Sequence, residues 1–283
     1  MNDFTLGYYS EFLSNLIKKN YIVLTLKDYL IDPDYNLNIT DKKYPNSNIL
    51  VLQHDVDRRP KNSLKKARLE HKLGIHSTYN FRTIPKTFQP KIIAEIADMG
   101  HEIGYHYENL TTTNGDYQQA IKDFEKNLAR LRQYYPVKTI CMHGSPLSQW
   151  DNRLLWQKYD YHDYGILGEP YFDLDYDNVF YITDAARSWN NGNVSVRDKV
   201  DSNHNITINH TDDIINLIQS DKAPSTIRLN THPEHWAATR TEWLRIYLIR
   251  LIKNTAKRLL IYLRPMSGGR KPETGNGKPE KNR

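Results

Sequence analysis

Hydrophobic and polar positions vary along this 283-residue chain in a rhythm that predicts a parallel α/β fold. Short apolar runs, typical of buried strands, alternate with segments in which apolar residues recur every three or four positions, as on amphipathic helices. The strand-like runs are residues 21–25, 49–52, 77–81, 101–106, 137–141, 179–182 and 226–229, and the helical segments are 8–19, 63–73, 90–99, 116–134, 150–158 and 212–220. About six to seven such βα units predict a deformed (β/α) barrel.

The positions of the charged residues divide the chain into a body and a basic C-terminal extension. Residues 241–283 hold eleven Lys and Arg against three Asp and Glu, a net charge of +8, which leaves −2 for residues 1–240 because the whole chain carries +6. We therefore expect a barrel domain over residues 1–240, an amphipathic basic helix over 241–263 and a disordered basic tail over 264–283. A near-neutral body excludes a nucleic-acid-binding groove, which needs positive charge on its docking face.

The composition excludes several further classes of protein. A hydrophobic fraction of 39% is enough to build a core, so the chain is not expected to be disordered. The single cysteine, Cys141, excludes a disulfide framework and a thiolate zinc cluster. The uncharged apolar runs are too short to span a membrane, and the N-terminal residues do not have the pattern of a secretory signal. A cytoplasmic location is therefore expected.

Ionisable side chains gather where the predicted strands end. Parallel barrels place their sites at the carboxyl ends of the strands, so we expect these side chains to converge. Two carboxylates at alternate positions suit a metal ligand beside a general base, and histidine is the commonest zinc ligand. The alternatives are a helix cap ahead of Pro60 for the carboxylates and a hydrogen-bonded packing role for a histidine. The strand-end residues are Asp55, Asp57, His106, His143, Asp184 and His232.

Three segments, in this order along the chain, resemble the polysaccharide deacetylases of carbohydrate esterase family 4. Leu52–Asp57 is similar to the first family motif, an apolar strand that ends in two aspartates, here separated by one residue. Gly74–Phe81 is similar to the Gly-x-x-[Ser/Ala]-Thr-[Tyr/Phe]-Phe-like stretch, and Gly100–His106 matches the motif Gly-His-Glu-Ile-Gly-x-His without a gap. The resemblance spans roughly residues 48–235 and includes a late apolar strand that leads into His232.

The resemblance implies a metal-dependent hydrolase that removes an N-acetyl group from a sugar of a polysaccharide or lipid-linked glycan, with zinc as the expected divalent ion. Carried over by motif, Asp55 is the general base, Asp57 and His106 are metal ligands, and His232 is the acid that protonates the leaving amine. The next metal-binding histidine of the family falls on Leu110, which cannot bind a metal, and the third family motif is not recognisable. These departures indicate a divergent branch, of the kind associated with surface-polysaccharide biosynthesis.

Two further sets of residues complete the predicted site. We expect His143 to be the third metal ligand, because it ends the strand that follows His106 and neighbouring strand ends converge in a barrel. Residues 160–200 are rich in polar and aromatic groups, and Arg187 with Trp189 is a candidate sugar-binding subsite, since flat aromatic faces and planar hydrogen-bonding groups recognise sugars. The alternative is that these residues hold loops together.

Two other functions are compatible with the sequence. The leucine at position 110 is compatible with a catalytically degenerate glycan-binding protein on the same fold. A metal-dependent amidohydrolase acting on a non-sugar amide would use the same site chemistry. For the C-terminal extension, we expect the first half of the helix to pack on the barrel, and the second half and the tail to contact the inner face of the membrane, where basic residues meet anionic headgroups.

Overall fold

The computed structural model describes residues 3–31, 48–146, 148–189, 197–220 and 222–263. In this part of the chain, seven strands form one sheet in which all paired strands are parallel. The order is β5-β4-β3-β2-β7-β6, and β1 also pairs with β2. The strands are β1 (Ile22–Leu24), β2 (Ile49–Val56), β3 (Thr78–Phe81), β4 (Glu102–Tyr107), β5 (Ile140–Met142), β6 (Val179–Thr183) and β7 (Thr226–Thr231).

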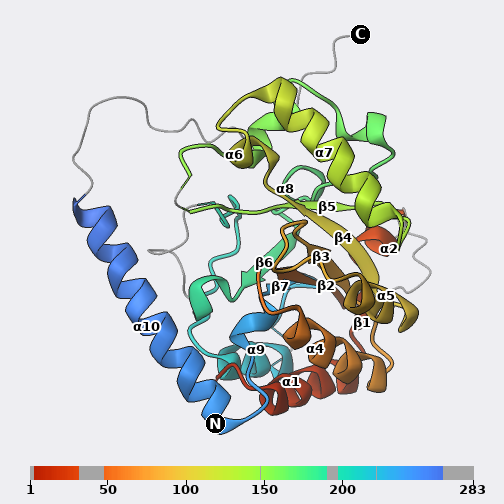
Figure 1. The fold of residues 1–283 in the computed structure, drawn as a ribbon. Coiled ribbons are helices and arrows are strands. Elements are labelled where there is room, and N and C mark those ends of the chain that lie inside the picture. Colours follow the sequence, from red (N-terminus) through yellow and green to blue (C-terminus); the bar gives the residue numbers. More distant parts are fainter. Residues whose placement is uncertain (1–2, 32–47, 147, 190–196, 221, 264–283) are drawn as a thin grey trace.

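The sheet curls into a deformed (β/α) barrel, which confirms the predicted fold class (Figure 1). β1 pairs with the first part of β2, at residues 49–51, and β3 pairs with the last part, at residues 53–56, so both strands occupy the same edge of β2. β7 occupies the other edge. No pairing between β5 and β6 is found among the described residues, so the barrel is open at that point.

Helices surround the sheet in the predicted order (Figure 1). α4 begins with Pro60, whose missing N–H suits the first helical position, and α7 is capped by the Asp116 carboxylate, which accepts a hydrogen bond from Gln119 N. The predicted helix at 150–158 is instead a 3₁₀ helix, a tighter form common in short connections. The α-helices are α1 (Leu6–Lys18), α2 (Leu26–Ile31), α4 (Pro60–Lys72), α5 (Pro90–Asp98), α6 (Asn109–Thr112), α7 (Tyr117–Arg132), α8 (Pro170–Asp173), α9 (Thr211–Gln219) and α10 (Arg240–Leu263), and the 3₁₀ helices are η1 (Asn152–Gln157), η2 (Tyr161–Tyr164), η3 (Ala185–Arg187) and η4 (Pro233–His235).

The interior of the barrel is polar toward the carboxyl ends of its strands, and this positions the site; earlier in β2, Ile49 and Val51 belong to an apolar cluster. β2 is buried along its whole length, and its side chains alternate between two environments. Leu50 and Leu52 belong to an apolar cluster with residues of α1 and α9, whereas Gln53 and Asp55 bond to neighbouring strands inside the barrel. Gln53 Oε1 accepts a 2.6 Å hydrogen bond from Nε of the fully buried Arg228 on β7. Because side chains alternate along β2, the Asp55 carboxylate lies among hydrogen-bonded side chains inside the barrel.

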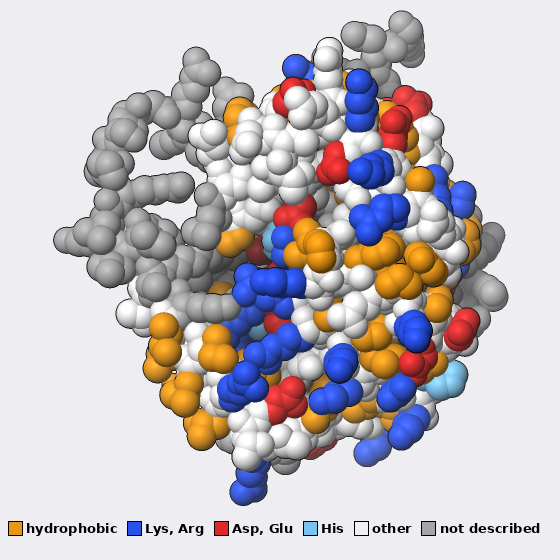
Figure 2. Space-filling view, in the orientation of Figure 1, with side chains coloured by type: hydrophobic (Ala, Val, Ile, Leu, Met, Phe, Trp, Pro, Cys, Tyr) orange, Lys and Arg blue, Asp and Glu red, His pale blue; other side chains and the backbone are white. Residues whose placement is uncertain are grey.

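α10 is a 24-residue helix that begins one residue before the predicted basic helix and ends with it. Its first half is attached to the body, since Trp243 Nε1 donates a 2.6 Å hydrogen bond to Asp3 O and Ile246 is buried. Among the described residues, no helix is long and apolar enough to cross a membrane. The predicted tail lies outside the described residues, and the division into domains stays a prediction. Among the α10 residues whose side chains are described, exposed apolar ones are Leu244, Tyr247, Leu248, Leu251 and Ile252, and Figure 2 shows apolar side chains along this side of the molecule.

Candidate metal and acid–base site

Three of the predicted residues converge at the carboxyl ends of β2, β4 and β5. Asp57 follows β2, His106 lies in β4 and His143 follows β5. Asp57 Oδ1 lies 3.0 Å from His143 Nδ1 and 3.2 Å from His106 Nε2, and the two imidazole nitrogens are 3.2 Å apart. With zinc bonds of about 2.0–2.1 Å, two ligand atoms of a tetrahedral site lie about 3.3 Å apart. The three atoms therefore have nearly the spacing of one face of such a tetrahedron.

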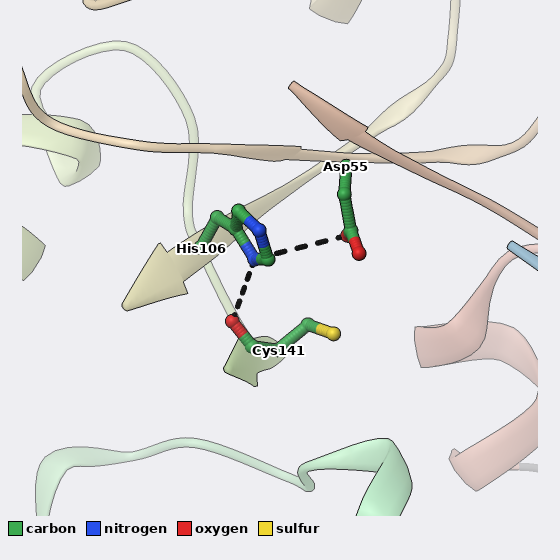
Figure 3. Close-up of side chains that lie close together, drawn as sticks. All are labelled: Asp55, His106 and Cys141. Atoms are coloured by element: carbon green, nitrogen blue, oxygen red, sulfur yellow. Dashed lines mark hydrogen bonds and ion pairs between the residues drawn. The ribbon is translucent and has the colours of Figure 1, made fainter. Parts of the chain in front are cut away.

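A backbone contact fixes the orientation of the His106 ring. Its Nδ1 lies 2.9 Å from Cys141 O, which can only accept, so Nδ1 carries the hydrogen (Figure 3). In the neutral ring, Nε2 then has a free lone pair, and this atom points toward Asp57 and His143. A second hydrogen bond of this kind is the usual way in which proteins orient a metal-binding histidine. In its neutral form, His106 is thus oriented so that Nε2 can bind a cation.

The chemistry of the donor set fits a divalent metal ion. Asp57 Oδ1 is buried, and among the described residues no well-aligned hydrogen-bond donor reaches it, although two imidazole nitrogens lie beside it. The neighbouring His143 and His106 hold the pKa of Asp57 well below its usual value even though burial raises it. An ionised carboxylate oxygen without an aligned donor, beside two imidazoles, matches the nitrogen and oxygen ligands of zinc. Asp57, His106 and His143 are therefore the residues that would hold the ion.

A second set of possible metal ligands, which also contains His106, does not fit a metal ion. Figure 3 shows Asp55, His106 and Cys141 close together. Both carboxylate oxygens of Asp55 already accept hydrogen bonds, from Asn80 Nδ2 at 2.9 Å and from Asn230 Nδ2 at 2.6 Å. Burial raises the pKa of the Cys141 thiol well above its ordinary value, so the thiol stays protonated. This arrangement favours a base beside the metal ligands, which is the role predicted for Asp55.

Asp55 is ionised despite its burial. Burial raises its pKa. The charges of His106 and His232 and the two amide hydrogen bonds lower it by a larger amount, so the pKa lies below its ordinary value. Asp55 Oδ1 lies 3.8 Å from His106 Nδ1. The carboxylate is therefore next to the ligand triangle, the three ligand atoms of Asp57, His106 and His143. An ionised carboxylate with remaining lone pairs can accept a proton from a reacting water.

His232 and Asp184 form a buried pair at the ends of β7 and β6. Asp184 Oδ1 lies 2.8 Å from His232 Nδ1 and also accepts a 2.8 Å hydrogen bond from the backbone N–H of His232. The other oxygen, Oδ2, accepts a 2.7 Å hydrogen bond from Trp236 Nε1. Although burial lowers it, the pKa of His232 is raised to about 10, mainly by Asp184, with Asp57 and Asp55 contributing. His232 is therefore protonated at neutral pH and can act as an acid through Nε2.

Asp184, His232 and His235 could also be read as a group of metal ligands, but their contacts exclude this. Asp184 has both oxygens occupied by hydrogen-bond donors, as described above. His235 Nδ1 lies 3.1 Å from the backbone oxygen of Asp184 and 3.6 Å from its carboxylate. The group is therefore a hydrogen-bonded network that orients His232.

Sequence reasoning missed the residues that hold the catalytic candidates in place. Asn80 lies directly opposite Asp55 in the β2–β3 register, and Asn230 is on β7, the other neighbour of β2. Trp236 was not singled out, and Asp184 was noted only as a strand-end residue. The available signal was a polar residue inside the predicted strand 77–81 and another directly after the predicted strand 226–229.

The two residues predicted to bind sugar, Arg187 and Trp189, have different surroundings. Trp189 is only 6% exposed, stacks on Phe4 and donates a 3.0 Å hydrogen bond from Nε1 to Thr211 Oγ1. Its indole ring fills the core, so its position does not support the predicted sugar contact. Arg187 is half-buried beside α10, and its role in substrate binding stays a prediction.

Leu110 lies in α6 and is fully buried in the main apolar core. Its aliphatic side chain packs there and offers no ligand atom. The nitrogen of His143 instead completes the triangle with Asp57 and His106. The structure thus brings together the ligand set predicted from sequence, and its role in binding metal is open to a direct test.

We expect wild-type protein to bind about one zinc ion, and His106→Ala and His143→Ala each to weaken binding by at least about 100-fold, because each removes one of three protein ligands. Zinc affinity measured by competition with a chelating dye checks this. His162→Ala is the matched control, since His162 is an exposed histidine whose side chain is 54% accessible. Unchanged affinity in His143→Ala would show that the third ligand lies elsewhere.

Comparison with known proteins gives only distant structural similarity. No protein-family model matches the chain, and no curated protein matches its sequence. The catalytic domain of the peptidoglycan N-acetylglucosamine deacetylase from Eubacterium rectale is 15% identical, with a TM-score of 0.41 over 80% of this chain and 90% of that one. Bacillus subtilis PdaA, a family 4 carbohydrate esterase, is 14% identical, with a TM-score of 0.39 over 86% and 83%. A CE4 family pseudoenzyme from Bacillus anthracis is 13% identical, with a TM-score of 0.40 over 76% and 63%. Similarity at this level does not assign a function to this chain.

Proposed function

We propose that the chain is a metal-dependent hydrolase that removes the N-acetyl group from a sugar of a polysaccharide or lipid-linked glycan. The observation that carries the proposal is the proximity of three elements: a triangle of metal-ligand atoms, an ionised buried carboxylate and a protonated histidine. All three lie at the carboxyl ends of β2, β4, β5 and β7. The order of the family motifs along the sequence supports the same reaction class, whereas a shared fold alone does not.

The residues divide the reaction between them. A divalent ion held by Asp57, His106 and His143 would polarise the acetyl carbonyl and acidify an attacking water. Asp55 takes the proton of this water, while the water oxygen forms a bond to the carbonyl carbon. The carbon–nitrogen bond then breaks, and His232 Nε2 gives its proton to the leaving nitrogen. The products are acetic acid and a free amino sugar. The proton on Asp55 then returns to His232 through solvent, which restores both residues, and acetic acid gives its proton to water or to the released amine, so atoms and protons balance.

Asp184 and Trp236 prepare His232 for this step. Because His232 Nδ1–H is bound to Asp184 Oδ1, the remaining proton of the imidazolium is on Nε2. Trp236 holds the other oxygen of Asp184, which prevents the carboxylate from rotating. The acid is thus charged and oriented before the substrate binds, which reduces the reorganisation needed during the reaction.

The test is acetate release from N-acetylated glycans by zinc-supplemented full-length protein. We expect release from a chitin tetramer or a lipid-linked N-acetylated sugar and none from N-acetylated peptides. Release from peptides alone would favour the non-sugar amidohydrolase. Saturable glycan binding in a calorimeter, without acetate release or bound metal, would favour the degenerate glycan-binding protein, the second candidate suggested by Leu110.

Membrane contact, a cytoplasmic location and a part in surface-polysaccharide biosynthesis stay separate predictions. For the membrane, we expect full-length protein to sediment with anionic liposomes at low salt and a variant that ends at Asn254 to sediment less, because basic residues near a charged surface each contribute about 1 kcal/mol. Co-sedimentation checks this. Equal binding by both proteins, or by neither, would show that the extension is not an anchor.

A further inference from the structure

Two arginines lie beside the His232–Asp184 pair, on the side of the barrel covered by α10. Arg187 lies in η3, three residues after Asp184, and Arg250 lies in α10. Arg250 Nη2 is 3.1 Å from Oε1 of Glu234, which belongs to η4, directly after His232. Figure 2 shows Lys and Arg side chains around a hollow in which histidine and acidic side chains are visible. Arg187 therefore follows β6, and Arg250 contacts the segment that follows the adjacent strand β7.

Arg187 is a half-buried cation without a carboxylate partner among the described residues. Among the described residues, its hydrogen bond runs from Nε to His235 O at 3.4 Å, and its Nη2 is buried without an acceptor. The guanidinium carbon lies 4.9 Å from the centre of the Trp243 ring and 5.1 Å from that of Phe4, so aromatic faces flank the group without accepting its hydrogens. A buried donor without an acceptor is rare in native proteins and indicates a missing partner.

The two arginines repel each other. Burial first and the charge of Arg250 second lower the pKa of Arg187 to about 10. Among the described residues, Glu234 is the one carboxylate within ion-pair distance of either arginine, and it contacts Arg250 alone. At neutral pH the two arginines therefore carry more positive charge than Glu234 can neutralise.

The backbone at Arg187 and at the residue before it is strained. Ala186 and Arg187 have φ angles of 58° and 60°, in the left-handed region that residues with a side chain rarely adopt. Strain of this kind persists where the surroundings enforce it and gathers at ligand-binding sites. By contrast, Arg82 on the opposite side of the site forms a two-pronged pair with Glu108, at 2.7 and 2.6 Å. Arg187 thus differs from Arg82 in that, among the described residues, no carboxylate lies within ion-pair distance of it.

We propose that Arg187 and Arg250 bind a phosphate group of the substrate, so that a phosphorylated N-acetyl sugar binds more tightly than a neutral glycan of the same sugar. The inference rests on the proposed function, which it makes more specific. Guanidinium groups recognise phosphate through paired charge-assisted hydrogen bonds, and two of them suit its oxygens better than they suit a neutral hydroxyl. Because η3 and η4 follow Asp184 and His232, the phosphate lies on the side from which the leaving nitrogen is protonated.

The test compares two ligands that differ only in the phosphate, N-acetylglucosamine and N-acetylglucosamine 1-phosphate. Their affinities for full-length protein are measured by calorimetry, with zinc and after chelation of zinc. We expect the phosphate to tighten binding at least about tenfold, and Arg250→Gln and Arg187→Gln each to remove most of this gain. Arg245→Gln, an exposed arginine on the same helix, is the matched control and keeps the gain.

Arg250→Gln decides the question if Arg187→Gln does not fold, because Arg250 is 24% exposed and contributes one ion pair. Equal affinity for both ligands in wild type, or an undiminished preference in Arg250→Gln, overturns the inference. So does a preference that disappears on chelation alone, since the phosphate would then be bound by metal. Inorganic phosphate that binds as tightly as the sugar phosphate overturns the assignment to a substrate. None of these measurements needs turnover, so absent acetate release counts against the proposed function alone.

Discussion

Replacement of Asp55 by Asn is expected to lower the turnover number for acetate release by about 10²–10⁴-fold, with zinc still bound. Asp55 lies beside the ligand triangle without forming one of its corners, and both of its oxygens are held by amides. The substitution removes the negative charge that accepts the proton of water and keeps the volume of the side chain. Initial rates measured together with zinc content separate loss of the base from loss of the metal.

A milder variant provides the control for this result. Asn80→Ala removes the 2.9 Å hydrogen bond to Asp55 Oδ1 but leaves the carboxylate and the Asn230 contact. We expect a smaller loss of about tenfold or less, because the base is present but less well held. Wild-type turnover in Asp55→Asn would mean that another group takes the proton, and a simultaneous loss of zinc would mean that Asp55 acts on the metal site instead.

The sequence predicted the strands and the residues at their ends because both depend on local patterns. β2 begins with a continuous apolar run, residues 49–52, and continues through polar and charged residues, and the barrel then brings its end next to those of β4 and β5. This is why Asp57, His106 and His143 could be named together before their distances were known. The local pattern does not contain the order β5-β4-β3-β2-β7-β6, which depends on long-range packing.

The sequence pattern could not show which side chains contact one another across neighbouring strands. Asn80 and Asn230 look like ordinary polar residues in a strand until the register places them on either side of Asp55. Trp189 shows the opposite problem, because an aromatic residue in a polar segment is typical both of a sugar-binding surface and of a buried anchor. Its hydrogen bond to Thr211, in α9, shows that the second applies here. The strained backbone before Arg187 has no sequence signal, since Ala186 has no preference for a positive φ.

Replacement of Asp184 by Asn is expected to move the alkaline limb of kcat/KM to lower pH. An acid catalyst works only while it is protonated, that is, below its pKa, and the pKa of His232 is about 10 because Asp184 raises it most. Without that negative charge the pKa falls toward the ordinary value of about 6.5, so at pH 8.5 about 1% of His232 is protonated and activity is about 100-fold lower. Rates measured from pH 5 to 10.5 check this. A limb at the same pH in both proteins would show that His232 is not the acid.

The ion pair between His232 and Asp184 also predicts a difference in stability between wild type and Asp184→Asn, which can be measured without turnover. The folded-state pKa of His232, about 10, lies above the unfolded-state value, so the stabilisation from the pair is fully present below about pH 6.5 and is lost as the pH rises through about 10. The difference in unfolding free energy between wild type and Asp184→Asn should therefore be largest near pH 6 and shrink toward pH 10. Trp236→Phe removes only the 2.7 Å bond to Asp184 Oδ2 and keeps the charge, so it should lower stability by a similar amount at both pH values. Urea unfolding at the two pH values distinguishes the two variants, and a pH-independent difference for Asp184→Asn would mean that His232 is neutral in the folded protein.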